Sequence, residues 1–266
     1  ANPRDLSTIG LQDLDDIRLN IPSILAGYNI GSLKQEVIVF LDEKRNKVAR
    51  SGTAFDPAAA FLGASIVTNF SPAQHNISYA LRNKMLLSGL ELDLSLGEYN
   101  NKQLSTLSSS VSGNVTTLLT QQDRILFVGL NGNIVLSDFV LKFDTSHKKG
   151  KRFPGSNPLS GPWSEHEVSE FSFGADYSGF NDLTINIELA NAYIHNHNIQ
   201  LANEQNEYGY SVRFDWRLYN DLLDLSLQHA NILGDNGSFS AFSVAYEYSD
   251  RINIGGKIIS FDSDTN

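Results

Sequence analysis

Val212-Arg213-Phe214-Asp215-Trp216-Arg217-Leu218 is the stretch that decides the fold class, because charged and bulky apolar side chains alternate strictly along it. Successive side chains of a β-strand point to opposite faces, so residues 212–218 would present an apolar face and a charged face. After Asn220-Asp221 the alternation resumes, with leucines at positions 223, 225 and 227. The segment therefore predicts an antiparallel hairpin with two chemically different faces.

The same period of two recurs along the chain, and no helical period competes with it. It predicts strands at residues 22–29, 34–42, 76–82, 86–96, 123–131, 134–144, 167–178, 183–194, 208–219, 222–231, 238–248 and 251–262. Many approach the ~9–11 residues that a tilted strand needs to cross a bilayer. Strands of soluble sheets are usually shorter, about 5–6 residues.

Short and long links alternate between these predicted strands. The short links carry the Gly, Asn and Asp of tight turns, and they fall at residues 30–33, 83–85, 132–133, 179–182, 220–221 and 250. The long links fall at residues 43–75, 97–122, 145–166, 195–207 and 232–237. A barrel with tight turns at one rim and long loops at the other has this rhythm.

Polar and apolar side chains are segregated on nearly every predicted strand. In a soluble sandwich the apolar faces would meet in a dry core, whereas in a membrane barrel they would face lipid around a polar lumen. Aromatic residues near strand ends, such as Tyr177, Tyr208, Tyr219 and Tyr248, favour the barrel, because such rings sit at membrane–water interfaces. The prediction is an all-β, antiparallel up-and-down transmembrane β-barrel in the bacterial outer membrane. A soluble all-β binding module is the alternative.

Composition narrows the function classes. The formal charge of −10 and the absence of a basic face argue against nucleic-acid binding. No cysteine is present, so Cys-based metal, redox and disulfide chemistry is excluded. No apolar run reaches 18 residues, as a transmembrane helix would require. We expect a single barrel domain over residues 1–266, with a long loop at 1–21 and hairpins over 22–262.

The ends of this barrel are expected to lie beyond the sequence. The chain opens on Ala-Asn-Pro-Arg-Asp without an apolar leader. It stops at Asn266 without a terminal aromatic residue. With twelve predicted strands in the sequence, we expect at least one more at each end, fourteen or more in all.

Three segments resemble an uncharacterised family of proteobacterial outer-membrane barrels. Residues 2–6 (Asn-Pro-Arg-Asp-Leu) with residues 10–19 (Gly-Leu-Gln-Asp-Leu-Asp-Asp-Ile-Arg-Leu) are similar to a characteristic loop of that family. Residues 52–57 and the strand–turn–strand unit at 174–189 are similar to two further family motifs. The resemblance implies an outer-membrane location in Gram-negative bacteria and further strands before residue 2. It also implies neighbouring export or lipid-trafficking proteins, and it supplies no catalytic residues.

Charged residues on the predicted inward face are the candidate functional site. Acidic residues predominate among them, and the lumen or constriction candidates are Glu91, Asp93, Glu188, Arg213, Asp215, Arg217 and Asp224. Rings of charge can set ion or solute preference in a pore. The alternative is a ladder of salt bridges that keeps the interior rigid. If the lumen is open, the acidic excess favours cations.

Metal and catalytic motifs are weak. His195 and His197 would share one face of a strand, as a metal half-site requires, but no third ligand is evident. Asp13, Asp15 and Asp16 form an acidic cluster that lacks the glycine and closing glutamate of a calcium loop. Neither a G-x-S-x-G elbow nor an H-E-x-x-H motif occurs. We therefore expect neither a cofactor nor an enzymatic activity.

The predicted function is a porin-like channel or transport component for small solutes. Its expected partners are membrane lipid and lipopolysaccharide, with envelope transport proteins as further candidates. The first alternative is a non-channel outer-membrane partner of an export or lipid-trafficking system, and the second is the soluble binding module.

Overall fold

The computed structural model describes residues 21–41, 65–71, 77–113, 115–156, 163–231, 237–249 and 252–262. These residues form one sheet of thirteen strands. The strands are β1 (Ser23–Ile30), β2 (Leu33–Phe40), β3 (Ser65–Phe70), β4 (Ser78–Leu87), β5 (Leu90–Ser112), β6 (Val115–Leu136), β7 (Phe139–Phe153), β8 (Ser164–Phe180), β9 (Leu183–Ile194), β10 (Asn206–Leu218), β11 (Leu223–Asn231), β12 (Ser238–Ser249) and β13 (Ile252–Asp262).

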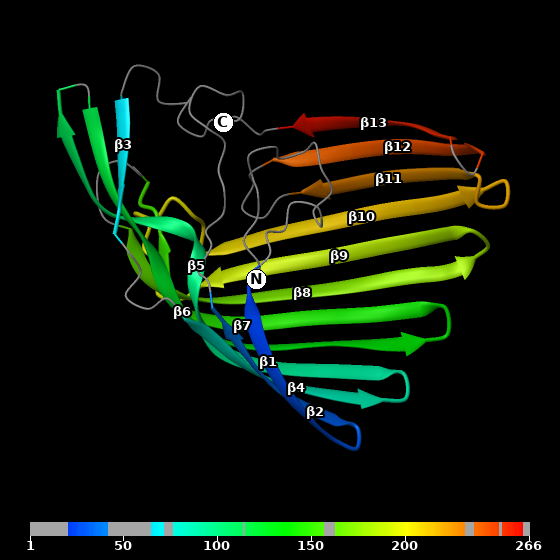
Figure 1. Ribbon diagram of the computed structural model, residues 1–266. Helices are drawn as coiled ribbons and strands as arrows, with labels where there is room; N and C mark the ends of the chain where they lie inside the picture. Colours follow the sequence, from blue (N-terminus) through cyan, green and yellow to red (C-terminus); the bar gives the residue numbers. More distant parts are fainter. Residues whose placement is uncertain are drawn as a thin grey trace.

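Twelve strands form an antiparallel meander in which each strand pairs with its neighbours in sequence (Figure 1). Only β3 leaves this order, because it pairs in parallel with the start of β6, from Ser65 opposite Val115 to Phe70 opposite Thr120. The predicted all-β, antiparallel up-and-down topology is confirmed. The sheet is open, because β1 and β13 end the strand order without pairing with each other in the described residues.

Tight turns gather at one end of the sheet, which we call the short-turn rim (Figure 1). Left-handed backbone conformations close several of them, at Gly31, Gly89, Ser137 and Asp182. The opposite end, the long-link rim, carries the links between β7 and β8 and between β9 and β10. The predicted alternation of short and long connections is therefore present from β6 to β11, whereas β5 and β6 are joined by residues 113 and 114 alone.

Two predicted turns were wrong. Residues 83–85 lie inside β4 and residues 132–133 lie inside β6, whereas the turns fall at Gly89 and Ser137. Gly132 was mistaken for a turn residue, but it is needed for close packing within the sheet. A Cβ at Gly132 would lie 2.7 Å from Leu92 Cδ2 and 2.9 Å from Phe143 Cε1.

The predicted long links at 97–122 and 145–166 were also too long. β5 continues to Ser112 and β6 begins at Val115, so most of the first link is an extended hairpin. β7 and β8 likewise extend into the second link. These extensions are rich in Ser, Thr, Gln and Lys, so they show no polar–apolar alternation. Antiparallel backbone pairing holds them together instead. The short strand β3 was missed within the predicted link 43–75.

The apolar face of the sheet is exposed rather than packed against a second layer. Its exposed side chains include Leu94, Leu96, Leu126, Val128, Leu130, Phe171, Phe173, Ile187, Leu189, Phe214, Trp216, Leu227, Phe242, Ile254 and Ile258. The cluster of buried apolar residues is small and holds only Phe153, Val168, Ile194 and Leu201 among the described residues. The dry core between two sheets that a soluble sandwich requires is thus lacking in the described part of the chain.

Within the described ranges, no helix is long and apolar enough to cross a membrane.

Candidate functional site on the polar face

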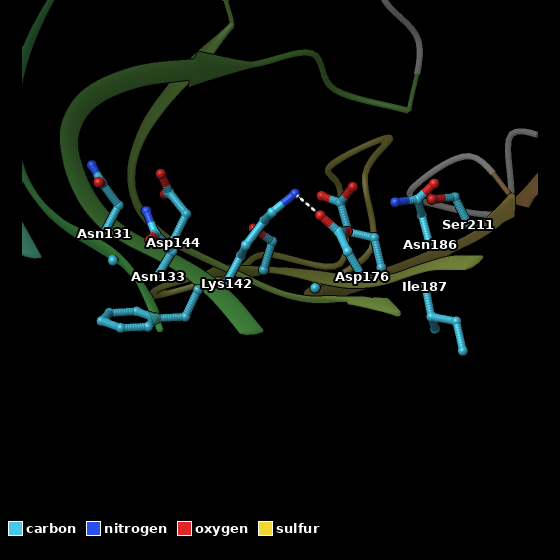
Figure 2. A pocket seen from close by; sticks show the side chains of 13 residues that line it. Asn131, Asn133, Lys142, Asp144, Asp176, Asn186, Ile187 and Ser211 are labelled. Carbon is cyan, nitrogen blue, oxygen red and sulfur yellow. Dashed lines mark ion pairs between the residues drawn. The ribbon is translucent and has the colours of Figure 1, made fainter. Parts of the chain in front are cut away.

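The second face of the sheet carries charged and amide side chains. Figure 2 shows Asn131, Lys142, Asp144, Asp176 and Asn186 rising from one side of the strands, while Ile187 points to the other side. Cross-strand pairing puts these polar residues in register, as in Asn131 opposite Asp144 and Asp176 opposite Asn186. The strict alternation of the sequence therefore becomes a continuous polar surface.

One hollow on this face, which we call the acidic hollow, has a volume of about 360 Å³. It is lined by strands β6 to β10, with Asn131, Asn133, Lys142, Asp144, Ser172, Asp176, Asn186, Glu188 and Ser211 among its residues. Lys142 forms an ion pair with Asp176. Asp144 and Glu188 form no ion pair with the described residues, so the lining holds three carboxylates against one ammonium group.

A second hollow lies towards the short-turn rim, and we call it the arginine hollow. It has a volume of about 790 Å³ and contains Arg213, Asp215, Arg217 and Asp224, with Asp182 and Asp221 beside the turns. Arg213 Nε lies 2.8 Å from Asp215 Oδ1. Arg217 and Asp224 are directly opposite in the β10–β11 register, but no ion pair within 4 Å joins them in the described structure.

The polar face towards the long-link rim is built differently, because its charges are paired and one of them is buried. Asp123, whose side chain is 1% exposed, accepts hydrogen bonds from Ser105 Oγ at 2.6 Å and from Arg152 Nη1 at 3.1 Å. Glu170 pairs with Lys148 and with Lys151. These pairs balance most of the charge in this region and leave little of it for a solute.

A small apolar cover lies over this paired region. Val168 pairs with Lys148 across β7 and β8, so both residues face the polar side. Phe153 and Leu201 bury Val168 together with Ile194, and the two links are joined by a hydrogen bond of 2.9 Å from Ala202 N to Pro154 O. The links after β7 and after β9 thus fold onto the polar face at the long-link rim.

The structure divides the predicted lumen candidates into two groups. Glu91 pairs with Lys84, and Asp93 lies 3.8 Å from Arg82, which also binds Glu36. Glu91 and Asp93 thus lie beside basic side chains, as expected if the inward charges form a ladder of salt bridges that keeps the interior rigid. Glu188 lines the acidic hollow, and Arg213, Asp215, Arg217 and Asp224 line the arginine hollow.

The weak metal candidates do not converge. His195 Nε2 lies 2.8 Å from Ser169 Oγ, whereas His197 Nε2 lies 2.8 Å from the carbonyl oxygen of Asn203. In the described part of the chain, no three His, Cys, Asp or Glu side chains are grouped as a metal site requires. Asp13, Asp15 and Asp16 lie outside the described residues.

Sequence reasoning missed the amides of the acidic hollow. Asn131 was read as the end of a strand, Asn133 as a turn residue and Asn186 only as a polar member of its strand. The available signal was their period: Asn131 and Asn133 alternate with the exposed Leu130, as Glu91 and Asp93 alternate with leucines on β5. Extending the alternation through Gly132 would have placed both amides on the polar face.

Comparison with solved structures finds outer-membrane proteins at low identity. OmpT, an outer membrane protein of Vibrio cholerae, has 8% sequence identity and a TM-score of 0.47, over 90% of this chain and 63% of that one. Acinetobacter baumannii OccAB3 has 12% identity and a TM-score of 0.49, over 91% of this chain and 62% of that one. Pseudomonas aeruginosa OccK8 (OprE) has 14% identity and a TM-score of 0.49, over 92% and 68%.

The chain therefore spans less than two thirds of the length of OmpT and OccAB3. At these values the likeness carries no conclusion about activity or substrate. No family model matches the chain, and no curated protein matches it either. The resemblance to an uncharacterised outer-membrane family stays a prediction.

The fold of the chain defines the class of protein. An up-and-down antiparallel sheet that exposes apolar side chains on one face and gathers charges on the other has the organisation of a transmembrane β-barrel wall.

Proposed function

We propose that this chain forms the wall of a bacterial outer-membrane β-barrel whose polar face lines a channel for small solutes, with a preference for cations. The observation that carries the proposal is the inverted arrangement of the sheet. Large apolar side chains are exposed over most of the outer face, and such a surface is stable in lipid but not in water. Membrane lipid and lipopolysaccharide are then the partners of that face.

The charge of the two hollows supports the cation preference. Asp144, Asp176 and Glu188 outnumber Lys142 in the acidic hollow, and four aspartates outnumber Arg213 and Arg217 in the arginine hollow. A pore lined by an excess of carboxylates raises the local concentration of cations and lowers that of anions. The amides and hydroxyls of Asn131, Asn133 and Ser211 add neutral hydrogen-bonding groups for a polar solute.

The links that cover the paired region support a restricted channel. Phe153, Val168, Ile194 and Leu201 occupy part of the polar face at the long-link rim, so a solute would pass beside this cover before it reaches the hollows. Closure of the wall is required by the proposal: β1 and β13 must pair, directly or through further strands.

Single-channel recording in planar bilayers tests the proposal. We expect discrete conductance steps from the full-length protein and a reversal potential in a KCl gradient that reports preference for K⁺ over Cl⁻. A folded protein that stays silent at high loading would contradict the channel. Co-purification of the silent protein with envelope transport proteins would favour the non-channel alternative, and a protein that stays soluble without detergent would refute the membrane location.

A further inference from the structure

A polar cluster interrupts the outer face near the long-link rim. It consists of His147 on β7, Glu167 and Ser169 on β8, and His195 directly after β9, and we call it the serine–histidine cluster. Val128, His147 and Ser169 are opposite one another on adjacent strands, so their side chains share one face. Val128 is 46% exposed on the apolar side, which places the cluster on the outer face.

The contacts within this cluster follow a definite order. His147 Nδ1 lies within hydrogen-bond distance of Ser169 Oγ, at 3.0 Å, and His147 Nε2 lies 3.5 Å from Glu167 Oε2, the distance of an ion pair. The negative charge of Glu167 beside Nε2 favours the tautomer of His147 with its proton on that nitrogen. Nδ1 is then free to accept the proton of the Ser169 hydroxyl.

A second imidazole contacts the same hydroxyl oxygen. His195 Nε2 lies 2.8 Å from Ser169 Oγ, and the rings of His147 and His195 meet edge to face at 5.4 Å between centroids. Since the hydroxyl proton of Ser169 is directed to His147, His195 serves as the donor to Oγ. A nucleophile, a base, an acid beside the base and a further N–H donor are therefore assembled by β7, β8 and the residue that follows β9.

We propose that Ser169, His147 and Glu167 form a hydrolytic site for the carboxylic esters of membrane amphiphiles. Ser169 Oγ attacks the ester carbonyl carbon while its proton moves to His147 Nδ1, and Glu167 stabilises the resulting imidazolium. The tetrahedral intermediate expels the alcohol, which takes the proton from His147. Water then repeats the sequence on the acyl-serine, releasing the carboxylic acid and restoring Ser169.

His195 is the group that stabilises the oxyanion in this scheme. Its Nε2 is already within hydrogen-bond distance of Ser169 Oγ, so it lies beside the carbon that Oγ attacks. A positioned donor at the developing negative charge is usually among the largest contributions to acyl transfer.

The surroundings of the cluster select an amphiphilic substrate. Phe171, two residues along β8 from Ser169, is 49% exposed on the same face, and with Val128 it begins the apolar surface. On the other side, Lys149 Nζ lies 3.4 Å from Glu167 Oε1 near the exposed long-link rim. An ester at Ser169 would thus have its acyl chain against the apolar side chains and its polar group towards the links.

A similar pair elsewhere on the sheet provides a matched control. Ser240 Oγ lies 2.9 Å from His229 Nδ1, and the other nitrogen of that ring lies 3.2 Å from the hydroxyl of Tyr210. This pair repeats the serine and the imidazole, but a phenol replaces the carboxylate that orients the base. Comparing Ser169 with Ser240 therefore isolates the effect of Glu167 and His195.

The proposal is independent of the channel, because the cluster and the hollows lie on opposite faces of the sheet. The test uses the full-length protein in detergent, with a fluorogenic phosphatidylcholine in mixed micelles as substrate and a fluorophosphonate as the serine-directed label. We expect ester hydrolysis and a covalent adduct on Ser169, located by mass spectrometry. We expect short-chain soluble esters to be cleaved more slowly than the micellar ester.

Substitutions test the proposed roles of Ser169 as nucleophile, His147 as general base and Glu167 as the carboxylate beside the base. Ser169→Ala and His147→Gln should lower hydrolysis by about 100-fold or more, the usual contribution of a nucleophile or general base. Glu167→Gln should lower it less and shift its pH profile, whereas Ser240→Ala should stay within about two-fold of the unmodified protein. The gel shift between unheated and heated samples checks that each variant is folded.

The outcomes are decisive in both directions. A folded, unmodified protein that neither hydrolyses the micellar ester nor reacts with the fluorophosphonate overturns the proposal, as does activity that survives in Ser169→Ala. Equal rates on soluble and micellar esters would refute the amphiphile as substrate. Hydrolysis without conductance would leave this site intact and contradict only the channel.

Discussion

The two ends of the polar face are made from the same kinds of residue, yet they hold their charges differently. Near the long-link rim, Asp123 and Glu170 are paired with basic groups, and Asp123 is also buried. Towards the short-turn rim, Asp144 and Glu188 line an open hollow without a partner cation in the described structure. An inward-facing carboxylate is therefore a structural group or a solute-facing group according to what the neighbouring strands and links place beside it.

The largest expected effect is on the free energy of unfolding, which should fall more when an ion pair is broken near the long-link rim than when one is broken near the short-turn rim. Arg152→Met removes the cation beside Asp123 and leaves a buried carboxylate uncompensated, which typically costs about 3–5 kcal/mol. Arg213→Met breaks an ion pair of the same type in the open arginine hollow, where the expected cost is about 0–1 kcal/mol. Urea unfolding of both variants in detergent measures the difference. Equal losses would show that the paired region is no more buried than the hollow.

An intermediate effect is expected on ion selectivity. A single charge about 8 Å from a passing ion changes the free energy of that ion by roughly 0.5 kcal/mol in water, with opposite signs for K⁺ and Cl⁻. Each carboxylate therefore changes the permeability ratio of K⁺ to Cl⁻ by about 1 kcal/mol, or roughly five-fold. Asp144→Asn combined with Glu188→Gln should lower this ratio about 30-fold. The reversal potential in a KCl gradient measures this ratio.

The matched control for that double variant is Glu98→Gln. Glu98 interacts with Tyr79 and Arg124 on the outer face, so its charge lies outside the proposed lumen. Its selectivity should equal that of the unmodified channel. If Glu98→Gln changed selectivity as much as the double variant, the assignment of the two faces would be wrong.

The smallest expected effect has the opposite sign. Lys142→Gln removes the cation that pairs with Asp176 and adds one uncompensated carboxylate to the acidic hollow. The permeability ratio of K⁺ to Cl⁻ should rise roughly five-fold by the same Coulomb argument. The same bilayer recordings would detect the change, and an unchanged ratio would show that Lys142 and Asp176 do not face the permeating ion.

Much of the fold could be predicted from local pattern. The alternation on β8 to β13 identified each strand to within about three residues, because a polar–apolar period of two is a property of the strand itself. The prediction failed where that period is weak. The extensions of β5 to β8 beyond the apolar band are polar on both faces, and Gly132 was read as a turn although close packing requires it.

The candidate site could be predicted only in part, for a related reason. Alternation predicts which residues share a face, and it placed Arg213, Asp215, Arg217 and Asp224 on one face, where all four line the arginine hollow. It does not predict which cation reaches which carboxylate, so two features were not foreseen: the pairing of Glu91 with Lys84, and the absence of an ion pair between Glu188 and any described residue. His147, Ser169 and His195 lie 22 and 26 residues apart, and no sequence motif spans such separations.

The sequence by itself determined that the chain is all-β, antiparallel and divided into an apolar and a charged face, because each of these properties follows from the period of side chains within single strands. The tertiary structure decided which charges are neutralised, where the links cover the polar face, and that two histidines and a glutamate gather around Ser169. Those outcomes depend on the register between strands, since a shift of one residue in pairing would move every one of these contacts to the opposite face.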